Sequence, residues 1–444
     1  MFPKPMFNIK IKNGENLYGR SHFKLRPDMT DPTYLRSKLV SDIRNRVGIK
    51  SISANYIQFY LNNEFMGLYI MTDVINLPWI KDVYSDKKST SLYKCDGLID
   101  FTANYSNLCV NKNEDVTDHS EWINFLKAVE NAESGSDLED ILDIDHLLYE
   151  MGIDYLTNAS DHYVHNFYMY KQPNGKWTYI SFDFDLDFSS LLGDVSEEDY
   201  FKSFTIGNRN RFYNLFISQD RERFNTILKD IVEKVFNPAT LYPHIDEIKQ
   251  FISPYVKLDK TPDSNGKYPG EINERSSKEI IPYEEWDKVT EFEATSYDIG
   301  LKYIILQKYR LVCSQLNMEC DPIYMDENYL NGVTNYQTDY DKNNLYSTEY
   351  EIPTEIPTEI PSDIPSDIPS EIPSEYSTNS SSTEPFIEEE TAYEVDEPTF
   401  STDEESSFDE EDNESDESVT ENVTTKTTKT ITKTQTIIYT TVLN

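Results

Sequence analysis

Alternating apolar and polar residues open the chain. Residues 6–12 (MFNIKIK) and 21–26 (SHFKLR) each carry apolar side chains at every second position, with basic ones between them. Because successive side chains of a strand point to opposite faces, both segments are predicted to be strands with a basic face. Asn13-Gly14 between them is typical of a turn.

A helix is predicted next. Asp31 suits its N-terminal cap, apolar residues recur at three- to four-residue spacing from Leu35 to Val47, and Gly48 is expected to end it. Residues 56–71 (YIQFYLNNEFMGLYIM) are two apolar runs around an Asn-Asn pair, which indicates a hairpin.

Comparable patterns continue to about residue 320. Residues 138–158 have helical spacing and lead into the polar heptad SDHYVHN. A hairpin is predicted over residues 167–188, where FYMYK and KWTYISFDFDLDF flank a Pro-Asn-Gly turn. Three further helices are predicted at residues 224–236, 242–256 and 297–316. The expected fold class is α+β, with a mostly β N-terminal part and a mostly helical C-terminal part.

From residue 351 the pattern changes. The unit Glu/Asp-Ile-Pro-Ser/Thr repeats six times up to Ser374, and a proline at every fourth position excludes a helix or a central strand. An extended spacer is predicted at residues 351–376, after a linker at 323–350. Residues 377–444, acidic and then Thr-rich, lack the apolar surface that offsets the entropy of folding, so they are predicted to form a disordered tail. The state of its strand-prone end is left open.

Charge divides the chain in the same place. The formal net charge is -40, and residues 351–420 contribute 24 acids with no Lys or Arg. A nucleic-acid partner is not expected, because phosphate binding needs a clustered positive surface. No segment has the roughly 18 consecutive apolar residues of a membrane helix, and the first residues show no signal-peptide pattern.

Four cysteines form two close pairs, Cys95 with Cys109 and Cys313 with Cys320. Their spacing fits two local disulfides and four unpaired core thiols equally well. It does not fit a zinc site, because no CxxC spacing is present and the histidines are scattered.

Candidate chemistry begins in the polar heptad. Asp161 and Asn166 stand in the Asp-x4-Asn relation of a protein-kinase catalytic loop, where the Asp orients the attacking hydroxyl and the Asn binds a metal. Taken alone, this spacing favours an ordinary turn residue, because Asp and Asn are common in loops. His162 and His165 show no ligand pattern and are expected to make loop hydrogen bonds.

The second candidate is the run FDFDLD at residues 182–187. On a strand, its three carboxylates, Asp183, Asp185 and Asp187, would lie on one face. Three like charges repel in a cleft unless a cation binds, although a solvated edge strand tolerates them. The flanking Phe residues favour burial, so a metal site is predicted, with Asp183 as the first ligand and Asp185 as the second.

Phosphate contacts are assigned to the basic N-terminal strands. The candidates are Lys10, Lys24 and Arg26, and Asp42 on the following helix is expected to pair with one of them. A cation on a strand face is more often simply solvated. Trp177 either lines a nucleotide pocket or belongs to the core, and the pattern does not choose between the two.

Five segments together resemble the spore coat protein H (CotH) kinase family over about residues 2–320. They are FNIKI, FKLRPD, DPTYLRSKLVSDIRNRVG, SISANYIQFYLNNEFMGLYIMTD and DHYVHNFYMYKQPNGKWTYISFDFDLDF. Members of that family are atypical kinases with a divergent protein-kinase-like fold. They are tied to spore coats or cell surfaces, and they use magnesium and ATP to phosphorylate protein Ser/Thr.

The resemblance implies a kinase-like domain at residues 1–322, with ATP and Mg²⁺ as cofactors. It implies a catalytic role for Asp161, metal binding by Asn166 and Asp183, and nucleotide contact from Trp177. Family members carry further N-terminal strands with an Arg-Gly-x-Ser loop, which leaves open that this domain lacks them.

Partner and location also follow from the resemblance. The expected substrate is a coat or surface protein or the chain's own acidic tail, and the expected location is extracellular, at a coat or cell surface. The alternative is a catalytically impaired, kinase-like surface or coat binding protein.

Overall fold

The computed structural model describes residues 2–12, 16–17, 19–27, 29–98, 101–162, 165–189, 196–203, 209–273, 280–332, 427–431 and 437–442. All of them belong to one compact unit. The spacer predicted at residues 351–376, and most of the predicted linker and tail, lie outside the described residues.

Six of the described strands form an antiparallel sheet. In spatial order they are β1 (Phe7–Lys10), β2 (His22–Arg26), β4 (Glu64–Asp73), β3 (Ala54–Leu61), β10 (Ile437–Val442) and β9 (Thr427–Ile431). Phe7 pairs with Leu25 and Lys10 with His22, so apolar and polar faces continue from one strand to the next. The predicted N-terminal strands and the predicted hairpin are therefore present.

The two last strands, β9 and β10, lie in the strand-prone end of the chain, whose state the sequence analysis left open. The backbone of β10 pairs with β3 from Ile438–Leu61 to Val442–Ile57. Without this pairing, β3 would be a sheet edge with unpaired N–H and C=O groups, and a Thr- and Ile-rich segment of high β propensity is suited to cover it. The local pattern indicated a strand but gave no partner for it.

A second antiparallel sheet contains β6 (Cys109–Asn111), β5 (Leu92–Cys95), β7 (Phe167–Lys171) and β8 (Trp177–Ser181), in that order. The β7–β8 hairpin turns at Gly175, whose φ of 91° lies in the left-handed region that glycine adopts without strain. The structure is thus a mixed α and β fold with two antiparallel sheets.

Helices occur between strands of both sheets and make up most of the described chain after β8. They are α1 (Arg36–Val47), α2 (Leu77–Tyr84), α3 (Ser120–Asn131), α4 (Ile144–Leu156), α5 (Glu197–Ser203), α6 (Arg209–Phe212), α7 (Arg221–Lys234), α8 (Pro238–Asp259), α9 (Tyr283–Val289), α10 (Leu301–Gln315) and α11 (Pro322–Met325). A π-helical turn spans Tyr213–Ser218, and 3₁₀ turns span Ala103–Leu108, Gly135–Leu138, Phe184–Leu186 and Tyr329–Gly332. Among the described helices, none has the length and apolar character needed to cross a bilayer.

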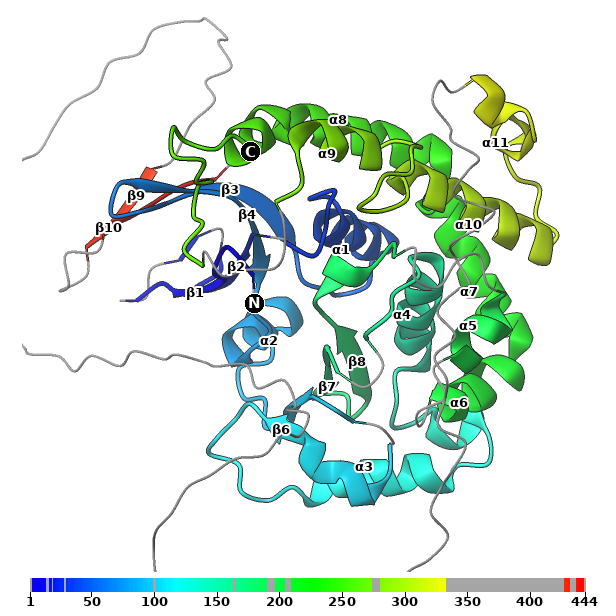
Figure 1. Ribbon diagram of the computed structural model, residues 1–444. Helices are drawn as coiled ribbons and strands as arrows, with labels where there is room; N and C mark the ends of the chain where they lie inside the picture. The colour runs from blue at the N-terminus through cyan, green and yellow to red at the C-terminus, as the bar shows by residue number, and fades with distance from the viewer. Residues whose placement is uncertain are drawn as a thin grey trace, which may run out of the picture. The chain divides into compact units, whose positions relative to one another are not determined.

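Helix α1 joins the larger sheet to the rest of the unit. It contacts β3 and also the turn Phe184–Leu186, and Figure 1 shows it near the centre of the ribbon. Gly48 ends it with φ of 89°, as predicted. Asp31 does not cap it. The buried Asp31 carboxylate accepts hydrogen bonds from the backbone N–H groups of Thr33 and Arg36 and so fixes the approach to the helix.

The prediction of an acidic strand at residues 182–187 is wrong. Strand β8 ends at Ser181, Asp183 adopts φ of 73°, and Phe184–Leu186 form a 3₁₀ turn. Phe184 is buried, with its ring 4.2 Å from the Arg44 guanidinium, so the chain turns to place this ring in the core. As a result the three carboxylates do not share one face.

Both cysteine pairs form disulfides in the structure, Cys95–Cys109 and Cys313–Cys320. The first links β5 to β6 and closes a loop with a sequence separation of 14. Replacing Cys95 and Cys109 together by Ser is expected to lower the free energy of unfolding by about 3 kcal/mol, because the unfolded chain regains the entropy of that loop. Denaturant unfolding of the oxidised protein measures the effect. A wild-type protein whose stability does not respond to a reductant would contradict the prediction.

Candidate active site

Two side chains of the polar heptad lie together after α4. Asn166 donates a hydrogen bond from Nδ2 to Asp161 Oδ2 at 2.8 Å. Its backbone has φ of 63°, and its carbonyl accepts a hydrogen bond from the N–H of Phe182 at 2.9 Å. The backbone bond ties the loop that carries Asp161 to the loop that carries Asp183.

Asp183 and Asp185 converge on strand β2. The Arg26 guanidinium meets Asp183 through two contacts of 2.5 Å and reaches Asp185 Oδ2 at 2.7 Å. Lys24, two residues earlier on the same face of β2, lies 4.0 Å from Asp183. Thr30 donates a hydrogen bond to Asp185. The acidic loop and the basic strand therefore form one site.

Burial and mutual repulsion shape the charges of this site. Burial raises the pKa of Asp183 to about 6; Arg26 opposes the shift, while Asp185 and Asp161 add to it. Burial also raises the pKa of Asp161. For Asp185, burial is outweighed by Arg26 and by the Thr30 hydrogen bond, so its pKa is lowered. Carboxylates crowded in this way are stabilised by any cation that reaches them.

A magnesium ion fits the residues that are present. Carboxylate and amide oxygens are the ligands that Mg²⁺ prefers, and Asp183, Asp185 and Asn166 supply them. Asp161 adds a second observation, since its buried Oδ1 has no hydrogen-bond partner among the described residues. Buried acceptors are normally satisfied, so an unsatisfied oxygen here indicates a site for a ligand or a substrate hydroxyl.

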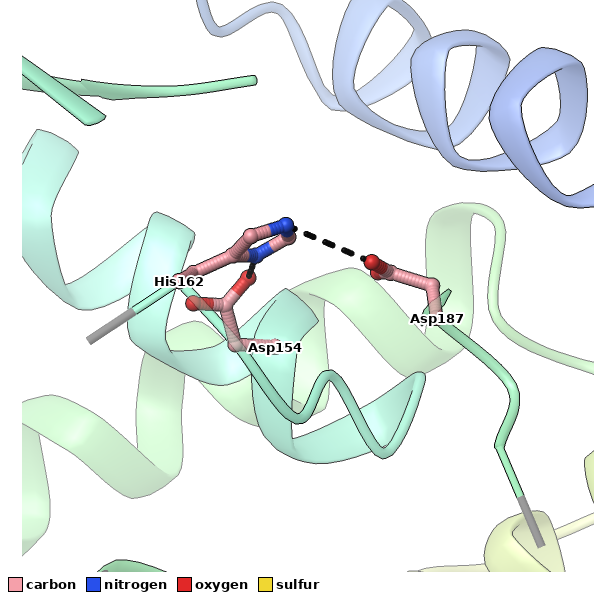
Figure 2. Close-up of side chains that lie close together, drawn as sticks. All are labelled: Asp154, His162 and Asp187. Atoms are coloured by element: carbon pink, nitrogen blue, oxygen red, sulfur yellow. Dashed lines mark hydrogen bonds and ion pairs between the residues drawn. The ribbon is translucent and has the colours of Figure 1, made fainter. Parts of the chain in front are cut away.

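His162 is the centre of a buried cluster beside this site. Its Nδ1 lies 3.1 Å from Asp154 Oδ1, and its Nε2 lies 3.2 Å from the carbonyl oxygen of Asp183 and 3.5 Å from Asp187 Oδ1. Figure 2 shows the imidazole between the Asp154 and Asp187 side chains. Asp187 is fully buried and also accepts a hydrogen bond from Thr157. It therefore belongs to a different site from Asp183 and Asp185.

The cluster of Asp154, His162 and Asp187 has the ligand types and spacing of a metal site. Without a metal, its charges form an ion-pair network. Burial lowers the pKa of His162, but Asp154 and Asp187 outweigh it and raise the pKa to about 10. A protonated imidazole can donate from both ring nitrogens. Arg44 at 2.7 Å from Asp154 already supplies a second positive charge.

The pH dependence of stability tests this network. A His with a raised folded-state pKa contributes stability that is fully present below its unfolded value of 6.5 and is lost as pH rises through about 10. The melting temperature of the wild type is therefore expected to fall between pH 7 and 10 relative to that of a His162→Gln variant. Parallel melting curves of both proteins over this range measure the difference. Two curves that stay parallel with pH would show that His162 is neutral when folded.

Two predicted residues, Lys10 and Trp177, lie elsewhere. Lys10 lines a cavity with His22 and Lys81, away from the carboxylates. The Trp177 ring is 2% exposed and packs against Trp122 and Phe125 in the core of the described unit, which selects the core alternative for its position.

Asp42 does not pair with a cation of the N-terminal strands, so that prediction is wrong. Its carboxylate contacts Lys38 one turn earlier on α1, at 2.5 Å, and His244 of α8, at 2.8 Å. These partners lie on the outer side of α1, where a one-turn Lys–Asp pair forms readily. The acidic helix residue of the kinase pattern therefore has no counterpart at Asp42.

One residue of the site region that the sequence did not suggest is Arg44, a buried arginine of α1. Arg44 contacts Glu150 at 3.1 Å, Asp154 at 2.7 Å and the Ser181 hydroxyl at 3.0 Å, and all four side chains are buried. An Arg on the apolar stripe of a helix, one residue after Ile43, was the signal available. Its partners are more than a hundred positions away in the chain, so the pattern could not name them.

Comparison with known proteins shows the family to which the chain belongs. A family model described as CotH kinase protein matches residues 1–291, more than half of the chain. Invasin CotH7 of Rhizopus delemar is 27% identical over 276 residues, which cover 56% of this chain and 46% of that protein. Spore coat protein homolog 1 of the same fungus is also 27% identical, over 278 residues, 56% of this chain and 45% of that protein.

A bacterial relative is more distant. Inner spore coat protein H of Bacillus subtilis is 21% identical over 279 residues, which cover 58% of this chain and 75% of that protein. The chain spans about half the length of the Rhizopus relatives it matches. The family match takes in every residue of the site described above, and by it the chain belongs to the CotH kinase protein family.

Proposed function

We propose that this protein is an atypical Ser/Thr protein kinase with a divergent kinase-like fold, which transfers the γ-phosphate of ATP to protein hydroxyls. One observation carries the proposal. The hydrogen-bonded pair Asp161–Asn166 and the carboxylates of Asp183 and Asp185 meet beneath a strand that presents Lys24 and Arg26. Phosphoryl transfer needs this combination of a base, metal ligands and cations.

Each residue has a role in the proposed reaction. Asp161 accepts a hydrogen bond from the attacking hydroxyl and takes its proton, and burial raises the pKa of this carboxyl, which strengthens it as a base. Asn166, Asp183 and Asp185 would hold magnesium, which supplies charge neutralisation at the phosphates when bound. Lys24 and Arg26 offset the remaining phosphate charge. Trp177 and Lys10 are given no part in transfer.

Coat or cell-surface association is part of the proposal. It is supported by the relatives, whose names describe invasins and spore coat proteins. The two disulfides add support, because disulfides persist in oxidising compartments outside the cytosol. The proposed substrate is a coat or surface protein, or the chain's own acidic tail.

A catalytically impaired binding protein is the alternative. It is favoured by Arg26, whose two contacts with Asp183 already neutralise the first metal ligand. Thermal stabilisation by ATP with magnesium separates the two functions, because a ligand that binds only the folded protein raises its melting temperature. A kinase is expected to melt higher with MgATP, and an Asp183→Ala variant is expected to lose that shift. No shift in the wild type, together with no label transferred from ATP, would leave the binding protein as the function.

A further inference from the structure

A cavity of about 620 Å³ lies next to β2, on the side of the sheet edge where α2 begins. Its basic lining residues are Lys10 of β1, Lys12 just after it, His22 at the start of β2 and Lys81 of α2. The larger sheet and a helix thus contribute to one concave surface. The proposed phosphotransfer uses none of these side chains.

The cavity carries uncompensated positive charge. Lys10, Lys12 and Lys81 make no ion pair with any described residue, and Asp82, the acid in the lining, has Arg20 at 4.0 Å. His22 reports the same field, because burial and Lys10 lower its pKa. Three unpaired lysines in one cavity stand out in a chain with a formal net charge of -40. A surface of this kind selects an anionic ligand.

Strand β2 connects the cavity to the proposed active site. His22, Lys24 and Arg26 occupy alternate positions and so share one face of the strand. Arg26 contacts Asp183 at the other end of this row. At about 3.3 Å per residue the row is roughly 13 Å long, the length of about four extended residues of a bound peptide. A peptide held in the cavity would therefore lie within roughly 13 Å of Arg26, and the Lys24 and Arg26 side chains would stay available to the proposed nucleotide.

The chain carries a segment of matching charge. Residues 403–417 (DEESSFDEEDNESDE) contain 10 acids among 15 residues, three serines and no Lys or Arg. This segment begins 71 positions after Gly332, the last described residue of the C-terminal helical part. As a random coil, 71 residues have a root-mean-square span of about 45 Å, which is long enough for such a segment to return to its own domain.

We infer that the cavity lined by Lys10, Lys12 and Lys81 is a docking site for an acidic, serine-containing peptide, and that its occupant is the chain's own segment 403–417. The docked segment presents its serines toward Asp161. Only this last consequence rests on the proposed phosphotransfer, because docking is measured without turnover.

The test uses the full-length chain with every Asp and Glu of residues 403–417 changed to Asn or Gln, which leaves the cavity free of its own tail. A fluorescent synthetic peptide of residues 401–420 is titrated into this protein, and anisotropy gives the dissociation constant. Charge reversal of Lys10, Lys12 and Lys81 to Glu is expected to weaken binding by about tenfold or more, since three exposed charge contacts are lost. Added salt is expected to weaken binding as well.

A matched control carries Lys88→Glu, Lys112→Glu and Lys127→Glu. These lysines are exposed and do not line the cavity. The two triple variants change the net charge by the same amount. The control is expected to bind the peptide as the parent does. Equal weakening in both triple variants, or none in either, would overturn the docking site.

Nucleotide binding is measured on the same proteins. The thermal shift caused by MgATP is expected to be the same in the parent and in the cavity variant. A cavity variant that loses this shift would assign the lysines to the nucleotide and overturn the inference. Failure of the proposed kinase activity would give a different result. None of the tested variants would then transfer phosphate, but peptide binding would still depend on the cavity lysines.

Discussion

Replacing Asp183 by Asn is expected to reduce phosphate transfer from ATP by at least about a hundredfold while leaving the protein folded. Asp183 is the carboxylate that faces both Asp161 and the cations of β2, and an amide in its place keeps a ligand oxygen but removes the negative charge that would hold magnesium. Transfer of labelled phosphate to the chain itself and to an acidic Ser-rich peptide measures the loss.

The stability of the same variant makes this prediction sharper. Asp183 has a raised pKa, so the folded state disfavours its charged form, and its contribution to stability improves as pH falls from about 6 toward 4. The Asn variant removes that charge and is expected to melt no lower than the wild type at pH 7. Asp42→Asn is the control, since it changes the same charge on the outer side of α1. An Asp183 variant as active as the Asp42 variant would refute the proposed metal site.

Replacing Arg44 by Met is expected to lower the free energy of unfolding by about 3–5 kcal/mol. The substitution leaves Glu150 and Asp154 buried without their guanidinium partner, and the ring of Phe184 loses its cation. The free energy of unfolding of many domains is only about 5–15 kcal/mol, so this substitution would remove a large part of it. Denaturant unfolding measures the change, and Arg46→Met, an exposed position on the same helix, is the control.

A milder variant keeps this prediction testable should the Met variant fail to fold. Burial raises the pKa of Glu150, but Arg44 and His146, with a smaller contribution from the Ser181 hydroxyl, outweigh it and lower the pKa to about 2. The resulting stability is present above the unfolded value of 4.5 and is lost as pH falls through about 2. Glu150→Gln is therefore expected to be less stable than the wild type at pH 7 and to approach it at low pH. Equal stability at pH 7 would mean that the ion pair contributes nothing.

Local pattern was enough for the elements with strong periodicity. The strands Phe7–Lys10 and His22–Arg26, helix α1 and the β7–β8 hairpin follow from spacing and turn residues in short windows. The acidic segment shows the limit of that reasoning. Its period of two matched a strand, but burial of Phe184 under Arg44 of a distant helix bends the chain into a 3₁₀ turn. Tertiary contacts override local alternation there.

In the proposed site, too, local pattern identified some residues, and others became apparent only from tertiary contacts. Asp161, Asn166, Asp183 and Asp185 were selected from spacing, and the structure brings them to one place with Arg26 and Lys24. His162 was expected only to make loop hydrogen bonds, yet it holds three elements together from a fully buried position. The sequence around His162 does not indicate its partners, because they come from other parts of the chain.

The backbone bond from Phe182 to Asn166 and the contact from His162 to the Asp183 carbonyl have a mechanical consequence. They fix the loop of the proposed base, Asp161, to the loop of the proposed metal ligands, Asp183 and Asp185, whereas Lys24 and Arg26 belong to the larger sheet. In the proposed reaction, a small movement of the larger sheet would therefore change the phosphate contacts and leave the spacing between base and metal ligands unchanged.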